Sequence, residues 1–211
     1  MMSQELTADQ VLCLAYAGAN TRAAYRAAFI IDGQFQAMVD AAHEPLLTRI
    51  KLAWWKEQGL STPVAGTPIG DAYLHLGGFR PQVTALIAAW DQALDGGDAE
   101  VESAAARGAA LFGLGAAVAG RDLTPSAERA AKAWGVADFA ARAQSPAALA
   151  LAKDHFTSTD LRDLRGALKP FGVLAALSKR DVECGFDKAP APGSPRRMLT
   201  AFVFALFNFR L

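Results

Sequence analysis

The chain has 211 residues, of which 52% are hydrophobic, and 21 basic and 21 acidic side chains give it a formal net charge of zero. A chain of this length can bury a sizeable core and is most simply one domain, 1–211. Zero net charge creates no overall field that would attract a polyanion, so we expect no nucleic-acid partner.

The cysteines and the apolar runs bear on the expected compartment. Cys13 and Cys184 stand far apart and in no metal-binding spacing, which favours two free thiols over a disulfide. The first ten residues lack the charged and apolar regions of a secretory signal. No apolar run approaches the ~20 residues that cross a bilayer. We therefore expect a cytoplasmic protein.

Helical periodicity organises the first half of the chain. Thr7 and Gln10 have the spacing of a capping box ahead of the apolar run 11–16. Apolar side chains then recur at helical spacing over 21–42 and over 43–59. Two prolines and two glycines within 61–70 predict a loop. A short element follows over 72–76, and a helix over 81–94 that ends at two glycines.

The second half is predicted to be helical as well. A helix of small residues is expected over 100–119, and Thr124 and Ser145 each precede a proline, which predicts helices over 124–143 and 146–156. Within 161–178, Pro170 predicts a helix that is either broken or begun at that proline. A loop over 186–195 precedes a final apolar helix over 198–209. No segment alternates with period two, so the predicted fold is all-α.

Several segments, in order, resemble the squalene and phytoene synthase family. The segment HEPLLTRIKLAWWK at 43–56 is similar to that family's "EPLLxxIRLxWW", and 130–142 is similar to its "AGRAWxLAxLLR" helix. The stretch 24–39 resembles the helix before the signature, and 168–181 with 192–196 resembles the family's ending. The resemblance covers most of the chain and is weakest between 61 and 97.

This resemblance implies a shortened helical bundle of the isoprenoid synthase type. Members of the family condense two prenyl diphosphates head to head, with Mg²⁺ bridging protein carboxylates and diphosphate. Acidic residues at i and i+4 lie on one face of a helix and can share a metal cluster. Two such D-x-x-x-D pairs on facing helices are therefore expected in an active member.

Both acidic pairs depart from the family pattern in this sequence. The position before the signature reads Gln36-x-x-x-Asp40, and Asp32 lies two turns from Asp40. The second pair is expected just after Arg142, but Ala143 and Ala147 occupy its two positions. Because alanine cannot ligate Mg²⁺ and an amide binds it weakly, we expect the metal cluster not to assemble. Asp32, Gln36 and Asp40 remain the candidate catalytic residues.

One literal D-x-x-x-D pair exists elsewhere, at Asp91 and Asp95. It falls at the end of a predicted helix, where the family has no such motif. Chance spacing on a solvated face explains it better than a metal site. If a divalent metal binds, Asp91, Asp95 and Asp40 are its candidate ligands.

The resemblance also suggests residues that would contact a substrate. They are Arg22, Arg26, Trp54, Trp55 and Arg142. Adjacent tryptophans point roughly 100° apart on a helix, so we expect one of the pair in the core and the other exposed. The arginines fit a diphosphate site and also an ordinary solvated surface.

The apolar tail at 196–211 has three interpretations. Its aromatic residues recur almost all round the predicted helix, and arginines stand at both ends. A helix that is hydrophobic all round is typically buried. A subunit contact and a peripheral membrane contact, with the arginines at lipid headgroups, are the alternatives.

Three functional hypotheses follow. The first is a family member without prenyl transferase activity that binds an isoprenoid or lipid or serves as an accessory, assembly-type protein. The second is an active Mg²⁺-dependent prenyl transferase that uses displaced carboxylates such as Asp32, Asp40, Glu44 and Asp138. The third is a helical interaction module, with a protein partner or a second copy, whose interior is filled by side chains.

Overall fold

The computed structural model describes residues 6–206, and within that range every regular element is helical. The all-α prediction is therefore confirmed. The α-helices are α1 (Ala8–Leu14), α2 (Ala19–Asp40), α3 (Pro45–Trp54), α4 (Pro68–Leu76), α5 (Arg80–Ala93), α6 (Asp98–Val118), α7 (Pro125–Ala143), α8 (Pro146–Thr157), α9 (Lys169–Cys184) and α10 (Pro195–Leu206). A π-helical turn (Trp55–Gly59) extends α3, and 3₁₀ turns occupy Leu161–Leu164, Gly166–Leu168 and Phe186–Lys188.

Local capping chemistry sets several of the helix starts. Thr7 and Gln10 form the complete capping box at the start of α1. The hydroxyls of Thr124 and Ser145 accept hydrogen bonds from backbone N–H groups in the first turns of α7 and α8. Pro170 lies in the first turn of α9, so a new helix begins there and no continuous helix is broken.

Several helix boundaries differ from the prediction. Residues 61–70 were expected to form a loop throughout, but α4 begins at Pro68. Thr67 caps it by accepting a hydrogen bond from the N–H of Gly70 at 3.1 Å. This Thr-Pro pair is the same signal that starts α7, and the neighbouring glycines obscure it. In addition, α9 continues six residues beyond the expected end at 178, to Cys184, and α10 begins at Pro195, three residues before the expected start at 198.

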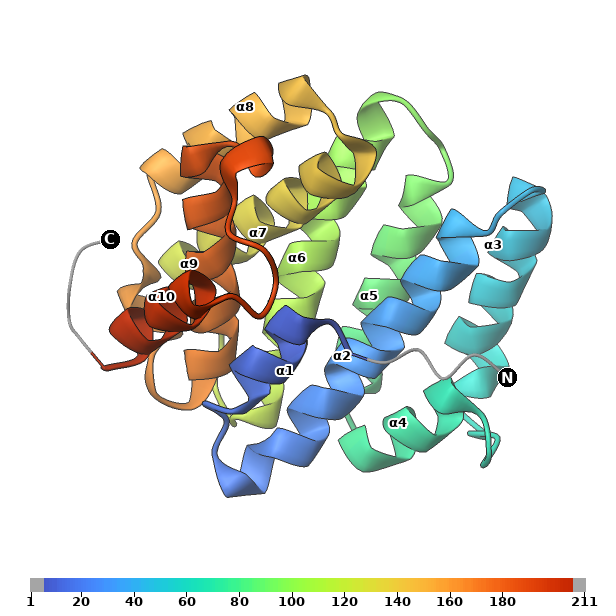
Figure 1. The fold of residues 1–211 in the computed structure, drawn as a ribbon. Coiled ribbons are helices and arrows are strands. Elements are labelled where there is room, and N and C mark those ends of the chain that lie inside the picture. The colour runs from blue at the N-terminus through green and yellow to red at the C-terminus, as the bar shows by residue number, and fades with distance from the viewer. Residues whose placement is uncertain (1–5, 207–211) are drawn as a thin grey trace.

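The two central helices, α6 and α7, approach each other backbone to backbone (Figure 1). A Cβ on Gly108 would lie 2.0 Å from the carbonyl oxygen of Ala131, and one on Gly135 would lie 2.0 Å from that of Ala104. Only glycine fits at these two positions. The close approach brings residues next to Gly108 within reach of side chains on α7.

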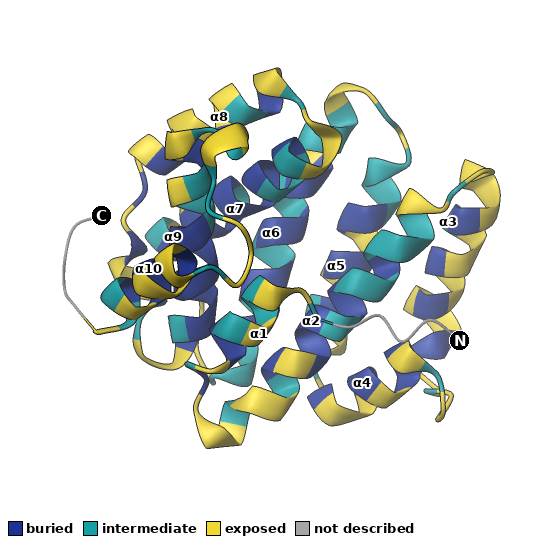
Figure 2. Ribbon diagram, in the orientation of Figure 1, coloured by how far each residue is buried: buried dark blue, intermediate teal, exposed yellow. Residues whose placement is uncertain are grey.

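The interior between α2, α6, α7 and α9 is filled by aromatic side chains. Phe112 packs against Trp134 and Phe171 at ring-centroid distances of 5.4 and 5.1 Å. Tyr25 and Phe29 contact the same Phe171 ring at 5.1 and 5.5 Å. All five side chains are buried, and the buried residues in Figure 2 concentrate on these helices. The centre of the bundle is therefore solid.

The helix α10 has two unlike faces. Arg197, Thr200, Ala201 and Phe204 are buried against the bundle. Its other face exposes large apolar side chains, at Met198, Leu199, Phe202 and Leu206. The helix is thus not buried all round as its composition suggested, and residues 207–211 of the predicted tail lie outside the described range. In residues 6–206, no helix is long and apolar enough to cross a bilayer.

A buried arginine holds α10 in place. The guanidinium of Arg197 donates to both carboxylate oxygens of Asp9, at 2.6 and 2.5 Å, and to both of Asp181, at 2.7 Å each. It also donates to the carbonyl oxygen of Pro190 at 3.2 Å. One side chain therefore joins α1, α9, α10 and the loop before α10.

Replacing this arginine tests its role in the fold. We expect Arg197→Met to lower the free energy of unfolding by about 3 kcal/mol, because two largely buried carboxylates lose their partner. The neighbouring Arg196 is exposed, so Arg196→Met should change it by less than about 0.5 kcal/mol. Urea unfolding followed by circular dichroism measures both, and equal effects would contradict this role.

Candidate binding site

A second buried arginine, Arg107 on α6, lies at the centre of an ionic network. Its Nε and Nη2 atoms donate to the two carboxylate oxygens of Asp32 on α2, at 2.9 and 2.6 Å. Its Nη1 donates to Asp138 on α7. Every nitrogen of the guanidinium is thus engaged, and the Arg107 and Asp32 side chains are only 4% and 1% exposed.

Two tryptophans enclose the Arg107 guanidinium. Its Cζ atom lies 4.7 Å from the ring centroid of Trp90 on α5 and 4.9 Å from that of Trp134 on α7. Aromatic faces attract a cation, which offsets part of the cost of burying it. The indole N–H of Trp90 also donates to Asp32 at 3.0 Å. Asp32 therefore accepts three hydrogen bonds, two from Arg107 and one from Trp90.

Besides Arg107, the network contains Arg142 on α7, which extends it toward solvent. Its Nε donates to Asp138 at 3.0 Å, and its Nη1 lies 3.5 Å from Asp40 at the end of α2. The amide of Gln36 donates to the other oxygen of Asp40 at 3.3 Å. Asp40 is thus held by two long contacts, and its side chain is 50% exposed.

The network shifts the pKa values of its members. Burial alone would raise the pKa of Asp138, but the charges of Arg107 and Arg142 and their hydrogen bonds outweigh it and hold the pKa below its usual range. Burial alone would lower the pKa of Arg107, but Asp32 and Asp138 raise it above its ordinary value. Both groups are therefore charged at neutral pH.

A cavity of about 610 Å³ opens beside this network, between α2, α5, α6 and α7. Its charged lining consists of Asp40, Glu100, Arg107 and Arg142. Its apolar lining includes Val39, Pro45, Trp90, Leu94 and Phe139. We call it the Asp40 cavity. Its volume and mixed lining are typical of small-molecule sites.

The structure brings together part of the residue set proposed from sequence. Asp32, Asp40 and Arg142 share one network, Gln36 contacts Asp40, and Ala143 lines the cavity. Ala147, in contrast, lies in the first turn of α8, where its side chain is exposed.

Sequence reasoning missed the central member of the network, Arg107. The signal was present, because Arg107 is a single charge within the alanine-rich run 104–110 of a helix expected to pack closely. A charge at such a position must be paired if the helix is buried. The identity of its partners, on α2 and α7, depends on tertiary packing.

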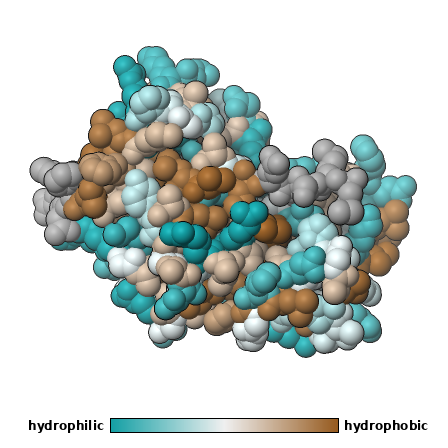
Figure 3. Space-filling view, turned by 60° about the horizontal axis from the view of Figure 1, so that its bottom comes forward, coloured by the Kyte–Doolittle hydropathy of each residue, from teal (hydrophilic) through white to brown (hydrophobic). Residues whose placement is uncertain are grey.

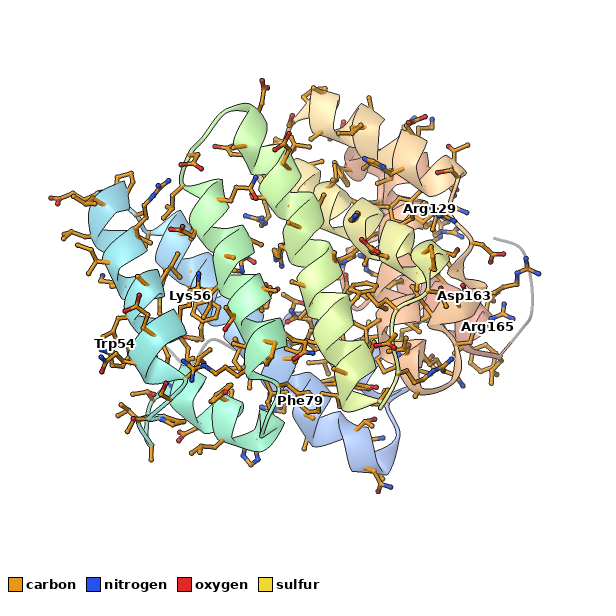
Figure 4. All side chains as sticks on the ribbon, turned by 180° about the vertical axis from the view of Figure 1, so that it is seen from behind. Trp54, Lys56, Phe79, Arg129, Asp163 and Arg165 are labelled. Carbon is orange, nitrogen blue, oxygen red and sulfur yellow. The ribbon has the colours of Figure 1, made fainter. Side chains whose placement is uncertain are left out.

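The remaining proposed substrate contacts lie apart from the Asp40 cavity. Arg22 donates to the carbonyl oxygen of Ala17 at 3.0 Å, at the start of α2. Arg26 lines a separate depression of about 420 Å³ between α2 and α4. Trp55 is buried, whereas Trp54 is 44% exposed at the edge of the molecule, where Figure 4 labels it. This is the division expected for adjacent tryptophans on a helix.

The two carboxylates of the D-x-x-x-D pair at Asp91 and Asp95 face an arginine. Arg49 on α3 makes an ion pair with Asp95 and lies 4.0 Å from Asp91. Across residues 6–206 there is no group of three or more His, Cys, Asp or Glu side chains arranged to hold a metal ion.

The outer face of α3 carries an exposed apolar stripe. Leu46, Leu47, Ile50 and Trp54 are between 44% and 71% exposed and recur at helical spacing within the signature segment. Figure 3 shows hydrophobic side chains gathered at the right-hand edge of the molecule, over α3. The stripe therefore faces away from the bundle, which α3 contacts through Thr48, Leu52 and Trp55.

Comparison of the chain with protein-family models, with curated proteins and with solved structures finds no match.

The first prediction at this site concerns Arg107. We expect Arg107→Met to lower the free energy of unfolding by about 3–5 kcal/mol, because Asp32 is left charged and buried. The double variant Arg107→Met with Asp32→Asn should recover part of that loss. Arg49→Met removes an exposed pair and should change the free energy of unfolding far less than Arg107→Met does. Urea unfolding distinguishes these variants, and a small loss for Arg107→Met would contradict the central role of the network.

A second prediction concerns pH. Folding lowers the pKa of Asp138, so the unfolded state binds its proton more readily. The resulting stabilisation is complete above the unfolded pKa, about 3.9, and is lost as the pH falls through the lower folded value. Between about pH 5 and pH 3, the unfolding free energy of the wild type should therefore fall more steeply than that of Asp138→Asn.

The matched control for Asp138 is Asp154, an exposed aspartate on α8. Asp154→Asn makes the same change in charge and should keep the wild-type dependence on pH. Urea titrations at several pH values measure the slopes. Equal slopes for Asp138→Asn and the wild type would contradict the electrostatic account of the site.

Proposed function

We propose that the protein is a squalene/phytoene-synthase-like helical protein that serves as a non-catalytic accessory, assembly-type factor. The proposal rests on the ordered sequence resemblance and on the all-α fold, which is compatible with a shortened isoprenoid synthase bundle. It further rests on what surrounds the carboxylates of α2 and α7.

The main support for the proposal is that arginines bind the carboxylates of α2 and α7. Prenyl transfer in the family requires Mg²⁺, which takes oxygen ligands at about 2.0–2.1 Å in near-octahedral geometry. Asp32 and Asp138 instead accept hydrogen bonds from Arg107, and Asp138 and Asp40 face Arg142. The residues present do not fit a magnesium cluster, because guanidiniums already bind or face these carboxylates.

The filled interior supports the same proposal. A prenyl transferase must enclose two long apolar tails, and the space between α2, α6, α7 and α9 is occupied by Phe112, Trp134 and Phe171. The Asp40 cavity remains open, but it lies beside charged groups. An isoprenoid or lipid held in the centre of the bundle is thus disfavoured relative to an accessory role.

The apolar stripe of α3 adds support for a role in protein contact. Clusters of exposed apolar side chains on one surface are typical of interaction sites. The stripe coincides with HEPLLTRIKLAWWK, the most distinctive segment of the sequence.

The alternative is an active transferase that uses displaced carboxylates. Of its candidate acids, Asp32 and Asp138 are bound to Arg107. Glu44 is exposed and precedes the first turn of α3, and it does not line the Asp40 cavity. Of these four acids, Asp40 is the one that lines the Asp40 cavity with a half-exposed carboxylate.

An assay of diphosphate release separates the two functions. We expect the purified protein, with Mg²⁺ and farnesyl or geranylgeranyl diphosphate, to release no more diphosphate than the heat-denatured protein does. Ala143→Asp places an acid at the cavity lining and should also remain inactive, since Arg107 and Arg142 are still present. Mg²⁺-dependent release that Asp40→Ala abolishes would establish the transferase instead.

A further inference from the structure

The Asp40 cavity and the network behind it together have an excess of negative charge. The network contains the carboxylates of Asp32, Asp40 and Asp138 and the two guanidiniums of Arg107 and Arg142. Glu100, at the start of α6, lines the cavity with Asp40 and brings the carboxylates of the network and the lining to four. Among residues 6–206, no lysine or histidine lines the cavity. An anionic ligand would therefore meet a net repulsive charge in a partly desolvated site.

Arg107 has little capacity left for an anion. All three of its nitrogens already donate to Asp32 and Asp138. Arg142 donates to Asp138 and faces Asp40. A phosphate that bound Arg142 would therefore lie next to these two carboxylates.

The carboxylate of Asp40, in contrast, has acceptor capacity to spare. An ionised carboxylate offers about four lone-pair sites. Its protein partners are the amide of Gln36 at 3.3 Å and the guanidinium of Arg142 at 3.5 Å. Both contacts are long, so a ligand N–H could make a shorter, charge-assisted bond.

The walls of the cavity suit an apolar body. The apolar lining includes Val39, Pro45, Leu94 and Phe139. The indole of Trp90 also lines the cavity and lies beside Arg107. The volume of about 610 Å³ exceeds what a single ammonium group would fill. Burial of apolar area at ~25 cal/mol per Å² would then add to the binding energy.

We propose that the Asp40 cavity binds an organic cation, a primary ammonium group on an apolar body, and excludes diphosphates. Asp40 accepts hydrogen bonds from the ammonium, Glu100 supplies a second negative charge, and the apolar walls hold the body. This goes beyond the proposed function, because an accessory protein requires no small ligand. It can fail while that function stands, since amine binding and diphosphate release are separate readouts.

The test compares three probes that differ only in the head group: decylamine, decanol and decyl phosphate. Isothermal titration of the full chain at pH 7, below the concentrations at which the probes aggregate, measures the three affinities. We expect decylamine to bind at least ten-fold more tightly than either of the others. Equal affinity for decanol, or tighter binding of decyl phosphate, would overturn the proposal.

Variants then locate the binding site. Asp40→Asn keeps the side-chain shape, removes the charge, and should weaken decylamine binding about ten-fold. Glu100→Gln should weaken it less, and Asp154→Asn, the same change of charge on exposed α8, should leave it unchanged. Ala143→Phe, which fills part of the cavity without changing charge, should weaken decylamine and decanol alike. Unchanged decylamine affinity in Asp40→Asn would overturn the assignment, and thermal melts check that each variant is folded.

Discussion

The structure depends on one buried cation, Arg107, and on the groups that neutralise it. Uncompensated burial of a guanidinium would cost more than a domain of this size can spare. Here α2 supplies Asp32, α7 supplies Asp138, and tryptophans of α5 and α7 lie against the guanidinium. The requirement to satisfy one side chain thus fixes four helices relative to one another.

The same interaction determines what the site can do. Carboxylates that bind a guanidinium are not available to share a divalent metal, and the centre of the bundle is filled by aromatic rings around Phe171. The function that we propose is therefore recognition. The Asp40 cavity offers an exposed carboxylate beside apolar walls, and α3 offers an apolar surface on the far side of α5.

Helix positions were largely predictable from sequence, because caps, prolines and glycines act locally. Thr124 and Ser145 cap helices through local hydrogen bonds that do not depend on tertiary packing. The start of α4 at Pro68 was missed because glycines lie nearby. The site was predictable only in part. Spacing placed Asp32, Gln36 and Asp40 on one helix, but the pairing with Arg107 spans 75 positions of sequence and depends on the close contact of Gly108 with α7.

We propose that arginines, and not metal ions, neutralise the carboxylates of α2 and α7. A crystal structure of the protein grown with Mg²⁺ and inorganic pyrophosphate tests it most directly. We expect Arg107 still bound to Asp32 and Asp138, with no metal within about 2.1 Å of an oxygen of Asp32, Asp40 or Asp138. Magnesium ions bridging pyrophosphate to Asp40 and Asp138, with Arg142 displaced, would contradict it.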